Sequence, residues 1–246
     1  MVLGQVARGA RVNVLIVGAS GGIGAALSLA LCERSGVTAV HGTGLRNTSV
    51  FAHEKMHWHC IDVQIESDIQ NLVSKLDKLD WLINCVGLLH SQELAPEKSI
   101  SQVTPESFMC LMSVNTLPTL LLAKHVKPLL LRSPQPLFAS ISARVGSITD
   151  NRLGGWYSYR ASKAALNMVI KCLAIEWSRT APRSVVAALH PGTTDTELSA
   201  PFQGNVPNHR LFTPEFTAAR LLSVLDSLQP ELSGRFWSWD GTELLW

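Results

Sequence analysis

The sequence predicts an α/β fold in which about seven parallel strands form one sheet with helices on both faces. Short apolar segments rich in β-branched residues alternate along the chain with stretches of helical periodicity. Such alternation is typical of a parallel sheet covered on both sides. The chain has 246 residues, of which 46% are hydrophobic and 16% charged. It can therefore bury one large core.

Six strands are expected from the apolar segments, taken in chain order. The first is Val12–Val17, and it is followed by a glycine-rich turn and the helix-forming stretch AALSLALCE. The others are expected at residues 37–41, 57–61, 81–86, 137–142 and 184–190. Near the end, Trp237, Trp239 and Trp246 indicate a further strand and a tail buried against a neighbour, for which another subunit is one candidate. This order of elements predicts a Rossmann-like, doubly wound sheet.

The chain is expected to form a single domain over residues 1–246. No Pro/Gly/Ser-rich linker divides it, and no unit of about 20–50 residues repeats along it. Residues 1–10 are expected to be a flexible tail. Residues 199–213 contain prolines, a glycine and asparagines that break a helix, so we expect a substrate-side loop there that can close over a ligand.

Charge and cysteine content exclude several classes of protein. The formal net charge is +2 and the basic residues are scattered, so nucleic-acid binding is not expected. The five cysteines are odd in number and form no Cys-x-x-Cys pair, which argues against a disulfide framework and a zinc site. Neither secretion nor membrane spanning is indicated, because Lys124, Lys127 and Pro128 interrupt the most apolar stretch. The expected location is the cytoplasm.

A glycine-rich turn, VGASGGIG, follows the first strand and precedes a helix. At Gly18, Gly22 and Gly24 the missing side chains let backbone N–H groups and the helix N-terminus approach a pyrophosphate. The spacing differs from the common G-x-G-x-x-G fingerprint. Glycines in such a turn also serve as tight-turn residues alone, so this motif needs support from elsewhere.

Polar residues at two further strand ends give that support. Asp62 follows the third strand, where it is placed to hold an adenine amino group or to cap the next helix. Asn84 and Gly87 close the fourth strand in INCVG. Both positions reach the carboxyl edge of the predicted sheet, where open α/β sheets bind ligands.

A tyrosine and a lysine share one face of the strongly helical stretch YSYRASKAALNMVIKCLAIEW. Tyr159 and Lys163 are four residues apart, which places them one turn from each other. A phenol has an unperturbed pKa of about 10, and a nearby cation favours the phenolate, so Lys163 is expected to lower the pKa of Tyr159. Such a pair can exchange the proton that carbonyl reduction requires. Taken alone, the pair also fits a surface tyrosine stacked on a lysine stem.

With its other motifs, the chain resembles the short-chain dehydrogenase/reductase family over essentially its whole length. In order, these motifs are the glycine turn, Asn84 with Gly87, Asn115 in SVNTLP, Tyr159 with Lys163, and Pro191-Gly192 followed by Thr194 and Thr196. The stretches SARVGSITDNRLGGWYSYRASKAALN and SGRFWSWDGTELLW further resemble the bacterial C-factor and insect sniffer-like carbonyl reductase subgroup.

The resemblance implies hydride transfer between a nicotinamide and a carbonyl or alcohol substrate, with Tyr159 exchanging the proton at oxygen. Lys163 would hold the nicotinamide ribose, and Asn115 would fix a water that links Lys163 to solvent. Thr194 and Thr196 would hold the carboxamide. The expected catalytic residues are Tyr159, Lys163, Ser142 and Asn115. The expected cofactor-binding residues are Gly18, Ser20, Gly21, Gly22, Ile23, Gly24, Arg46, Asp62, Val63, Asn84, Gly87, Tyr159, Lys163, Pro191, Gly192, Thr194 and Thr196.

The serine that polarises the substrate oxygen in this family is displaced. The family pattern Ser-Ser-x-x-Gly reads SARVG here, so that, aligned on Gly146, Ala143 stands where the second serine is usual. Three alternatives are open: Ser142 serves after a backbone shift, Ser147 reaches in from the loop, or hydroxyl assistance is missing. We favour Ser142, which requires an irregular strand end, because neighbouring side chains on a regular strand point to opposite faces.

The end of the second strand bears on cofactor choice. NAD binders usually carry an acidic residue there, and NADP binders a basic group. The segment VHGTGLRN has no Asp or Glu. Arg46 is well placed to bind a ribose phosphate, and His41 is a weaker candidate for the same role. An exposed loop arginine is the alternative interpretation. We therefore predict NADP(H) as the cofactor, with NAD(H) as the alternative.

No metal site is expected. His53, His57 and His59 lie close in sequence but have no fourth ligand, so a solvated or edge-strand role is favoured.

The sequence thus predicts an NADP(H)-dependent carbonyl reductase for small or xenobiotic ketones and aldehydes, assembled as a homodimer or homotetramer. Its expected partner is a small carbonyl or alcohol substrate, with no nucleic acid and no membrane span. A C-factor-like nucleotide-binding signalling or regulatory protein with little turnover is the alternative, which Ala143 favours. In a third hypothesis, the glycine turn binds no nucleotide and the chain is an interaction protein.

The loops around residues 88–97, 147–156 and 199–211 are expected to form the substrate pocket. Their sequences do not indicate the substrate.

Overall fold

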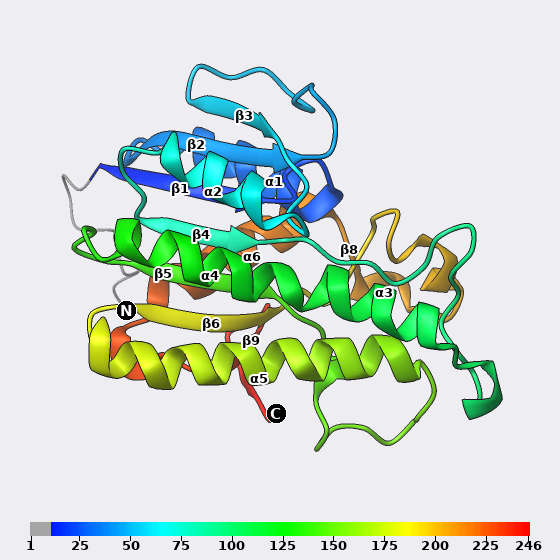
Figure 1. Cartoon of the computed structure of the whole chain (residues 1–246). Coiled ribbons are helices and arrows are strands. Elements are labelled where there is room, and N and C mark those ends of the chain that lie inside the picture. Colours follow the sequence, from blue (N-terminus) through cyan, green and yellow to red (C-terminus); the bar gives the residue numbers. More distant parts are fainter. Residues whose placement is uncertain (1–10) are drawn as a thin grey trace.

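One sheet of eight strands extends through the computed structural model, which describes residues 11–246 (Figure 1). The strand order is β10-β9-β6-β5-β4-β1-β2-β3. Every neighbouring pair is parallel except β9 and β10. The strands are β1 (Val12–Val17), β2 (Val37–Gly44), β3 (Met56–Cys60), β4 (Trp81–Asn84), β5 (Leu137–Ile141), β6 (Val185–His190), β9 (Arg235–Ser238) and β10 (Glu243–Leu244).

Helices cover both faces of this sheet, so the predicted fold class is confirmed. Helices α1 (Gly22–Cys32) and α6 (Pro214–Ser227) pack together on one face. Helices α2 (Glu66–Ser74), α4 (Leu117–Leu130) and α5 (Tyr157–Thr180) cover the other, and α3 (Pro105–Asn115) extends from it (Figure 1). Alternate β1 residues divide between two cores: Val14 and Ile16 face α1 and α6, whereas Leu15 and Val17 face α4 and α5. The expected tail at residues 1–10 lies outside the described residues.

Several strand boundaries differ from the predicted ones by one to three residues. β4 ends at Asn84 rather than at residue 86, and beyond its end Asn84 Oδ1 accepts a hydrogen bond from the N–H of Val86 at 3.1 Å. β5 ends at Ile141, one residue before the predicted end. β2 is three residues longer than predicted and ends at Gly44. Strand order reverses between β1 and β4, where such sheets open a crevice at their carboxyl edge.

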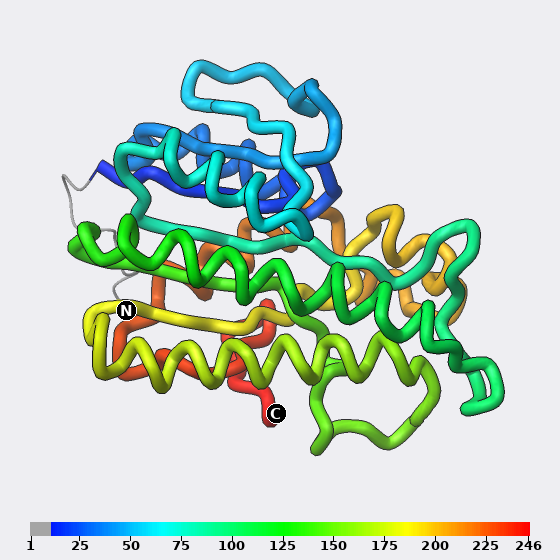
Figure 2. Tube along the Cα trace, viewed as in Figure 1, coloured from blue at the N-terminus to red at the C-terminus, as the bar shows by residue number. Residues whose placement is uncertain are grey.

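The segment predicted as a loop, residues 199–213, contains local structure. It includes two 3₁₀ helices, η3 (Ala200–Asn205) and η4 (Asn208–Arg210), and the short strand β8 (Leu211–Phe212). β8 pairs with β7 (Thr193–Thr194), which fixes the segment to the end of β6. Figure 2 shows this segment beside the chain that follows β4, where His90 Nε2 lies 3.1 Å from Glu197 O.

The C-terminal tryptophans pack within this chain. β9 pairs with β6, as the predicted C-terminal strand requires. Trp239 contacts Phe212, with ring centroids 4.5 Å apart, and Trp246 stacks on Phe236 at 5.5 Å. Trp239 and Trp246 therefore pack against residues of the same chain.

One described stretch, Pro105–Leu130, is long and apolar enough by composition to cross a membrane. It comprises two helices, α3 and α4, that meet at Thr116. Leu122, Val126 and Leu130 of α4 are buried in the core. Helix α4 thus packs against the core, whereas much of α3, including Phe108 and Met109, is exposed.

Candidate active site

A pocket of about 900 Å³ opens at the carboxyl ends of β1, β4, β5 and β6. Most of the predicted site residues line it: Ser20, Gly21, Gly22, Ile23, Gly24, Gly87, Ser142, Tyr159, Lys163, Pro191, Gly192, Thr194 and Thr196. The others, which are not in its lining, are Gly18, Arg46, Asp62, Val63, Asn84 and Asn115. The tertiary structure therefore brings the glycine turn and the Tyr159–Lys163 pair into one cavity.

The glycine turn leaves the N-terminus of α1 open towards this pocket. Gly18 has a φ of +80°, and a Cβ at Gly24 would lie 2.2 Å from Gly18 O, so both positions require glycine. The residue before the helix, Gly21, provides no side-chain cap. The N–H groups of the first turn of α1 are thus available to an anion, and the turn fits a pyrophosphate.

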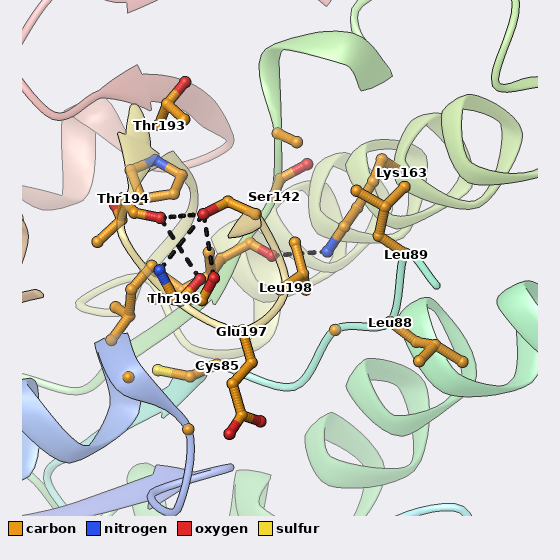
Figure 3. Close-up of a pocket in the computed structure, with 18 of the residues that line it drawn as sticks. Cys85, Leu88, Leu89, Ser142, Lys163, Thr193, Thr194, Thr196, Glu197 and Leu198 are labelled. Atoms are coloured by element: carbon orange, nitrogen blue, oxygen red, sulfur yellow. Dashed lines mark hydrogen bonds between the residues drawn. The ribbon is translucent and has the colours of Figure 1, made fainter. Parts of the chain in front are cut away.

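Tyr159 and Lys163 lie on the buried face of α5. The two residues are 5% and 3% exposed, respectively, and Lys163 Nζ lies 5.9 Å from the centre of the Tyr159 ring. Lys163 Nζ donates to the carbonyl of Ile141 at 3.1 Å (Figure 3). The helix thus places both groups against the end of β5.

Burial sets the protonation of both groups. It lowers the pKa of Lys163 to about 8 and raises the pKa of Tyr159 above its ordinary value. The expected lowering of the Tyr159 pKa by Lys163 was therefore wrong for this state of the molecule, because desolvation of the phenolate is the dominant effect. Tyr159 is a protonated phenol at neutral pH, which is the form that a general acid requires.

The N-terminus of α5 is held by an acid from another part of the chain. Trp156, at the N-cap, adopts a left-handed conformation with a φ of 51° and supplies no side-chain cap. Glu97 lies in the loop after β4 and is buried, with 3% of the residue exposed. It accepts hydrogen bonds from the N–H and the hydroxyl of Ser158, and its carbonyl accepts the N–H of Trp156. Sequence analysis did not identify Glu97, because nothing local distinguishes it from a surface acid.

Asn115 ties three parts of the site together. Its side chain exchanges two hydrogen bonds with the backbone of Leu88, at 2.7 and 2.9 Å, and donates to Ser162 Oγ at 2.9 Å. A Cβ at Gly87 would lie 3.8 Å from Asn115 Oδ1 and 3.4 Å from Lys163 Nζ. Asn115 thus positions the chain after β4 against α5. Its predicted water-fixing role stays a prediction.

At the end of β5, Ser142 and Ala143 present their side chains in different directions. The Ser142 hydroxyl lies on the α5 side, where it donates to Asn167 Oδ1 at 2.6 Å. Ala143 is extended, with φ −146° and ψ 146°, and packs in the apolar cluster that contains Tyr159. Ser147 accepts the N–H of Asp150 and is not among the residues that line the pocket. Ala143, which carries only a methyl group, therefore lines the same pocket as Tyr159, and the predicted role of Ser142 stays a prediction.

The wall opposite α5 is a cluster of hydroxyl groups after β6. Thr194 Oγ1 lies 2.9 Å from Thr217 Oγ1, and Ser199 Oγ donates to the carbonyl of Thr194 (Figure 3). A Cβ at Gly22 would lie 2.6 Å from Thr196 Cγ2, so Thr196 contacts the glycine turn. Thr194, Thr196 and Ser199 thus form the pocket wall next to the glycine turn.

Aromatic side chains form the outer end of the pocket. The Trp156 ring packs edge-on against Tyr159 at 6.1 Å and against Phe202 at 5.1 Å, and Phe202 contacts His90 at 5.6 Å. Leu198 and Val145 complete this apolar wall. The loops expected to form a substrate pocket do meet here, but the sequence did not indicate that Trp156 and Phe202 face Tyr159.

Two residues expected at the adenosine end lie outside the pocket. Arg46 is exposed, two residues beyond β2. Asp62 accepts the N–H of Gln64 at 2.9 Å, whereas α2 begins at Glu66 with Ile65 at its N-cap. Asp62 therefore closes a turn and does not cap the helix, so that alternative was wrong.

The neighbouring histidines form a stack across β2 and β3. His41 Nδ1 lies 3.0 Å from His59 Nε2, and the His41 ring stacks on His57 at 5.1 Å. Burial lowers the pKa of His41 to about 4, so it is neutral at pH 7 and offers no charge to a phosphate. In residues 11–246 no group of three or more His, Cys, Asp or Glu side chains is arranged to hold a metal ion.

Comparison with protein families gives one match over most of the chain. The short chain dehydrogenase model matches residues 12–206. A 1-hydroxy-2-glutathionyl-2-methyl-3-butene dehydrogenase of Rhodococcus sp. (strain AD45) is 32% identical over 242 residues, which cover 95% of this chain and 99% of the relative.

Two further similarities bear on the subgroup. The C-signal protein of Myxococcus xanthus is 34% identical over 135 residues, which cover 54% of this chain and 75% of that protein. A carbonyl reductase from chicken fatty liver, solved with NADPH bound, superposes with a TM-score of 0.85 at 26% identity, over 96% of this chain and 95% of that one. The predicted likeness to the C-factor and carbonyl reductase subgroup is confirmed.

Proposed function

Because the chain belongs to the short chain dehydrogenase family, we propose that it transfers a hydride between NADP(H) and a carbonyl or alcohol substrate. Tyr159 is its general acid and base. One observation carries the proposal: the buried Tyr159–Lys163 pair and the uncapped N-terminus of α1 line the same pocket.

The residues present fit the cofactor. The first turn of α1 would hold the pyrophosphate, Lys163 the nicotinamide ribose, and Thr194 with Thr196 the carboxamide. Arg46 would hold the ribose phosphate. The NADPH found in the chicken carbonyl reductase supports this choice over NAD(H). When bound, the cofactor supplies the hydride.

The chain itself supplies the proton and the surroundings. In reduction, the Tyr159 phenol donates its proton to the substrate oxygen as the carbon accepts the hydride. Lys163, whose pKa burial lowers to about 8, is mostly protonated at neutral pH and would stabilise the phenolate that results. In oxidation, the Tyr159 phenolate would accept the proton of the substrate alcohol as the hydride leaves the carbon. The apolar wall of Trp156 and Phe202 excludes water and suits an apolar carbonyl compound.

The test is NADPH oxidation with a panel of aldehydes and ketones, for the native protein and for Tyr159→Phe. We expect turnover with some of the carbonyls, and a loss of about 10²–10⁴-fold in the variant because the general acid is gone. NADPH affinity, measured by fluorescence titration, should change little. Full turnover by Tyr159→Phe would disprove the mechanism.

A nucleotide-binding signalling protein with little turnover is the second candidate. The methyl group of Ala143 beside Tyr159 and the likeness to C-signal favour it. It would be supported if the native protein bound NADPH tightly, reduced nothing in the panel, and gained activity only with Ala143→Ser. Binding of neither nucleotide would instead favour an interaction protein.

We propose a cytoplasmic protein that assembles as a homodimer or homotetramer. Cell fractionation and light scattering coupled to size-exclusion chromatography measure these two properties directly.

A further inference from the structure

An indole from β3 covers the carboxyl end of β2. Trp58 is half-buried and pairs in register with Gly42. A Cβ at Gly44 would lie 2.7 Å from Trp58 Cζ2, and one at Gly42 would lie 3.3 Å from Trp58 Cε3. The two glycines of β2 therefore leave the space that the indole fills.

The polar edge of this indole holds the loop that follows β2. Trp58 Nε1 donates a hydrogen bond to the carbonyl of Arg46 at 2.8 Å. Next to it, Cys60 Sγ lies 3.5 Å from the carbonyl of Leu45. Two side chains of β3 thus fix the backbone from which the Arg46 side chain extends.

The guanidinium at this position is available to an anion. Within the described part of the chain, no carboxylate lies within 4 Å of it. The adjoining Gly44 and Leu45 carry no acidic group that would hold the hydroxyls of an unphosphorylated ribose. Arginine presents a planar fork of donors that matches a phosphate, and its benefit depends on where its backbone is held.

This corner also adjoins the glycine turn. Ser20 Oγ lies 3.1 Å from the Cβ position at Gly44, and Ser20 lines the pocket together with Gly21 and Gly22. Trp58 is thus in place to fix the distance between the proposed pyrophosphate site and Arg46.

We propose that Trp58 is a positioning residue for cofactor selection: its indole N–H holds Arg46 where the guanidinium binds the phosphate on the adenosine ribose of NADP(H). The inference rests on the proposed function. It assigns Trp58 a role in telling NADPH from NADH, exerted through Arg46 and without contact to the nicotinamide.

The test measures equilibrium dissociation constants for NADPH and NADH by calorimetry, so it does not depend on turnover. Trp58→Phe keeps an aromatic side chain at this position of β3 and removes the N–H. We expect it to weaken NADPH binding by about fivefold, as the loss of one positioning hydrogen bond implies, and NADH binding by less than about twofold. Arg46→Ala should weaken NADPH binding further than Trp58→Phe does. In the double variant the Trp58 change should add nothing, because it acts through Arg46.

Trp246→Phe is the matched control, since Trp246 packs on Phe236 away from this corner, and its NADPH-to-NADH ratio should equal that of the native protein. Trp58→Met, which also lacks the N–H, replaces Trp58→Phe if that variant does not fold. An unchanged ratio in both variants, or effects that add to those of Arg46→Ala, would overturn the role of Trp58 and leave the proposed function standing. If the native protein binds neither nucleotide, the proposed function fails as well.

Discussion

The two walls that meet at Tyr159 are built differently. On one, α5 is fixed by contacts from distant elements: Glu97 holds its N-terminus, Asn115 bonds to Ser162, and Lys163 bonds to the end of β5. On the other, the end of β5 presents the methyl group of Ala143 and directs the Ser142 hydroxyl to Asn167.

This difference separates two requirements of carbonyl reduction. On the proposed mechanism, the proton donor Tyr159 is buried and held in place before any ligand binds, as preorganised catalysis requires. The Ser142 hydroxyl donates to Asn167, so on the same mechanism the developing negative charge would have fewer hydrogen bonds on that side. The two walls thus support the proposed acid and the proposed oxyanion site unequally.

Removal of the lysine should have the largest effect on the supported wall. Lys163→Met fills the same space without charge, and we expect reduction at pH 7 to fall by about 10²-fold, in the range found for groups that assist proton transfer. In the native protein the pKa of about 8 means that the ammonium form is lost as pH rises through 8. Reduction should therefore decline above pH 8, whereas the Lys163→Met rate should stay flat between pH 7 and 9. A decline of the same size in both proteins would assign the titration to another group.

Restoration of the missing hydroxyl should have the next largest effect. Ala143→Ser adds a donor beside Tyr159, and kcat/KM for carbonyl reduction should rise by roughly tenfold, since one oxyanion donor contributes about 10²–10³-fold in well-formed sites. Steady-state kinetics over the carbonyl panel measures it. An unchanged or lower kcat/KM in a folded variant would show that this wall does not limit the reaction.

Substitution of Glu97, which caps the N-terminus of α5, tests how far this contact supports the wall that carries Tyr159 and Lys163. Glu97→Gln has a single carbonyl oxygen for the two donors of Ser158, so a buried donor is left without its partner and unfolding should become easier by about 1–3 kcal/mol. Urea denaturation measures this. Turnover at 25 °C should fall only a few-fold, because the carbonyl of residue 97 still holds Trp156. Glu106→Gln, at the exposed start of α3, is the control: it should lower the free energy of unfolding by less than about 1 kcal/mol and leave turnover unchanged.

The smallest effect is expected from substitution of Ser142 at the end of β5. Ser142→Ala removes the hydrogen bond to Asn167, which should lower stability by about 1 kcal/mol. Because the hydroxyl donates to Asn167 on the α5 side, turnover should change by less than about threefold. A loss of tenfold or more, with the fold intact, would instead establish Ser142 as the polarising residue that the sequence favours.

The sequence by itself determined the features that depend on local pattern. Alternating apolar and helical segments specified the parallel sheet, because side-chain periodicity follows directly from backbone geometry. The four-residue spacing placed Tyr159 and Lys163 on one helix face, and the glycine turn between β1 and α1 was evident from Gly18 and Gly24.

Only the tertiary structure decided the contacts between residues far apart in the chain. Glu97 and Ser158 are 61 positions apart, and Ser142 and Asn167 are 25 apart. No local rule shows which acid is buried at a helix end, or which of two neighbours at a strand end faces the pocket. Those outcomes follow from how α5 packs against β5 and the loop after β4. The same holds for Trp58 on β3 and Arg46 in the loop after β2, which the pairing of these two strands brings together.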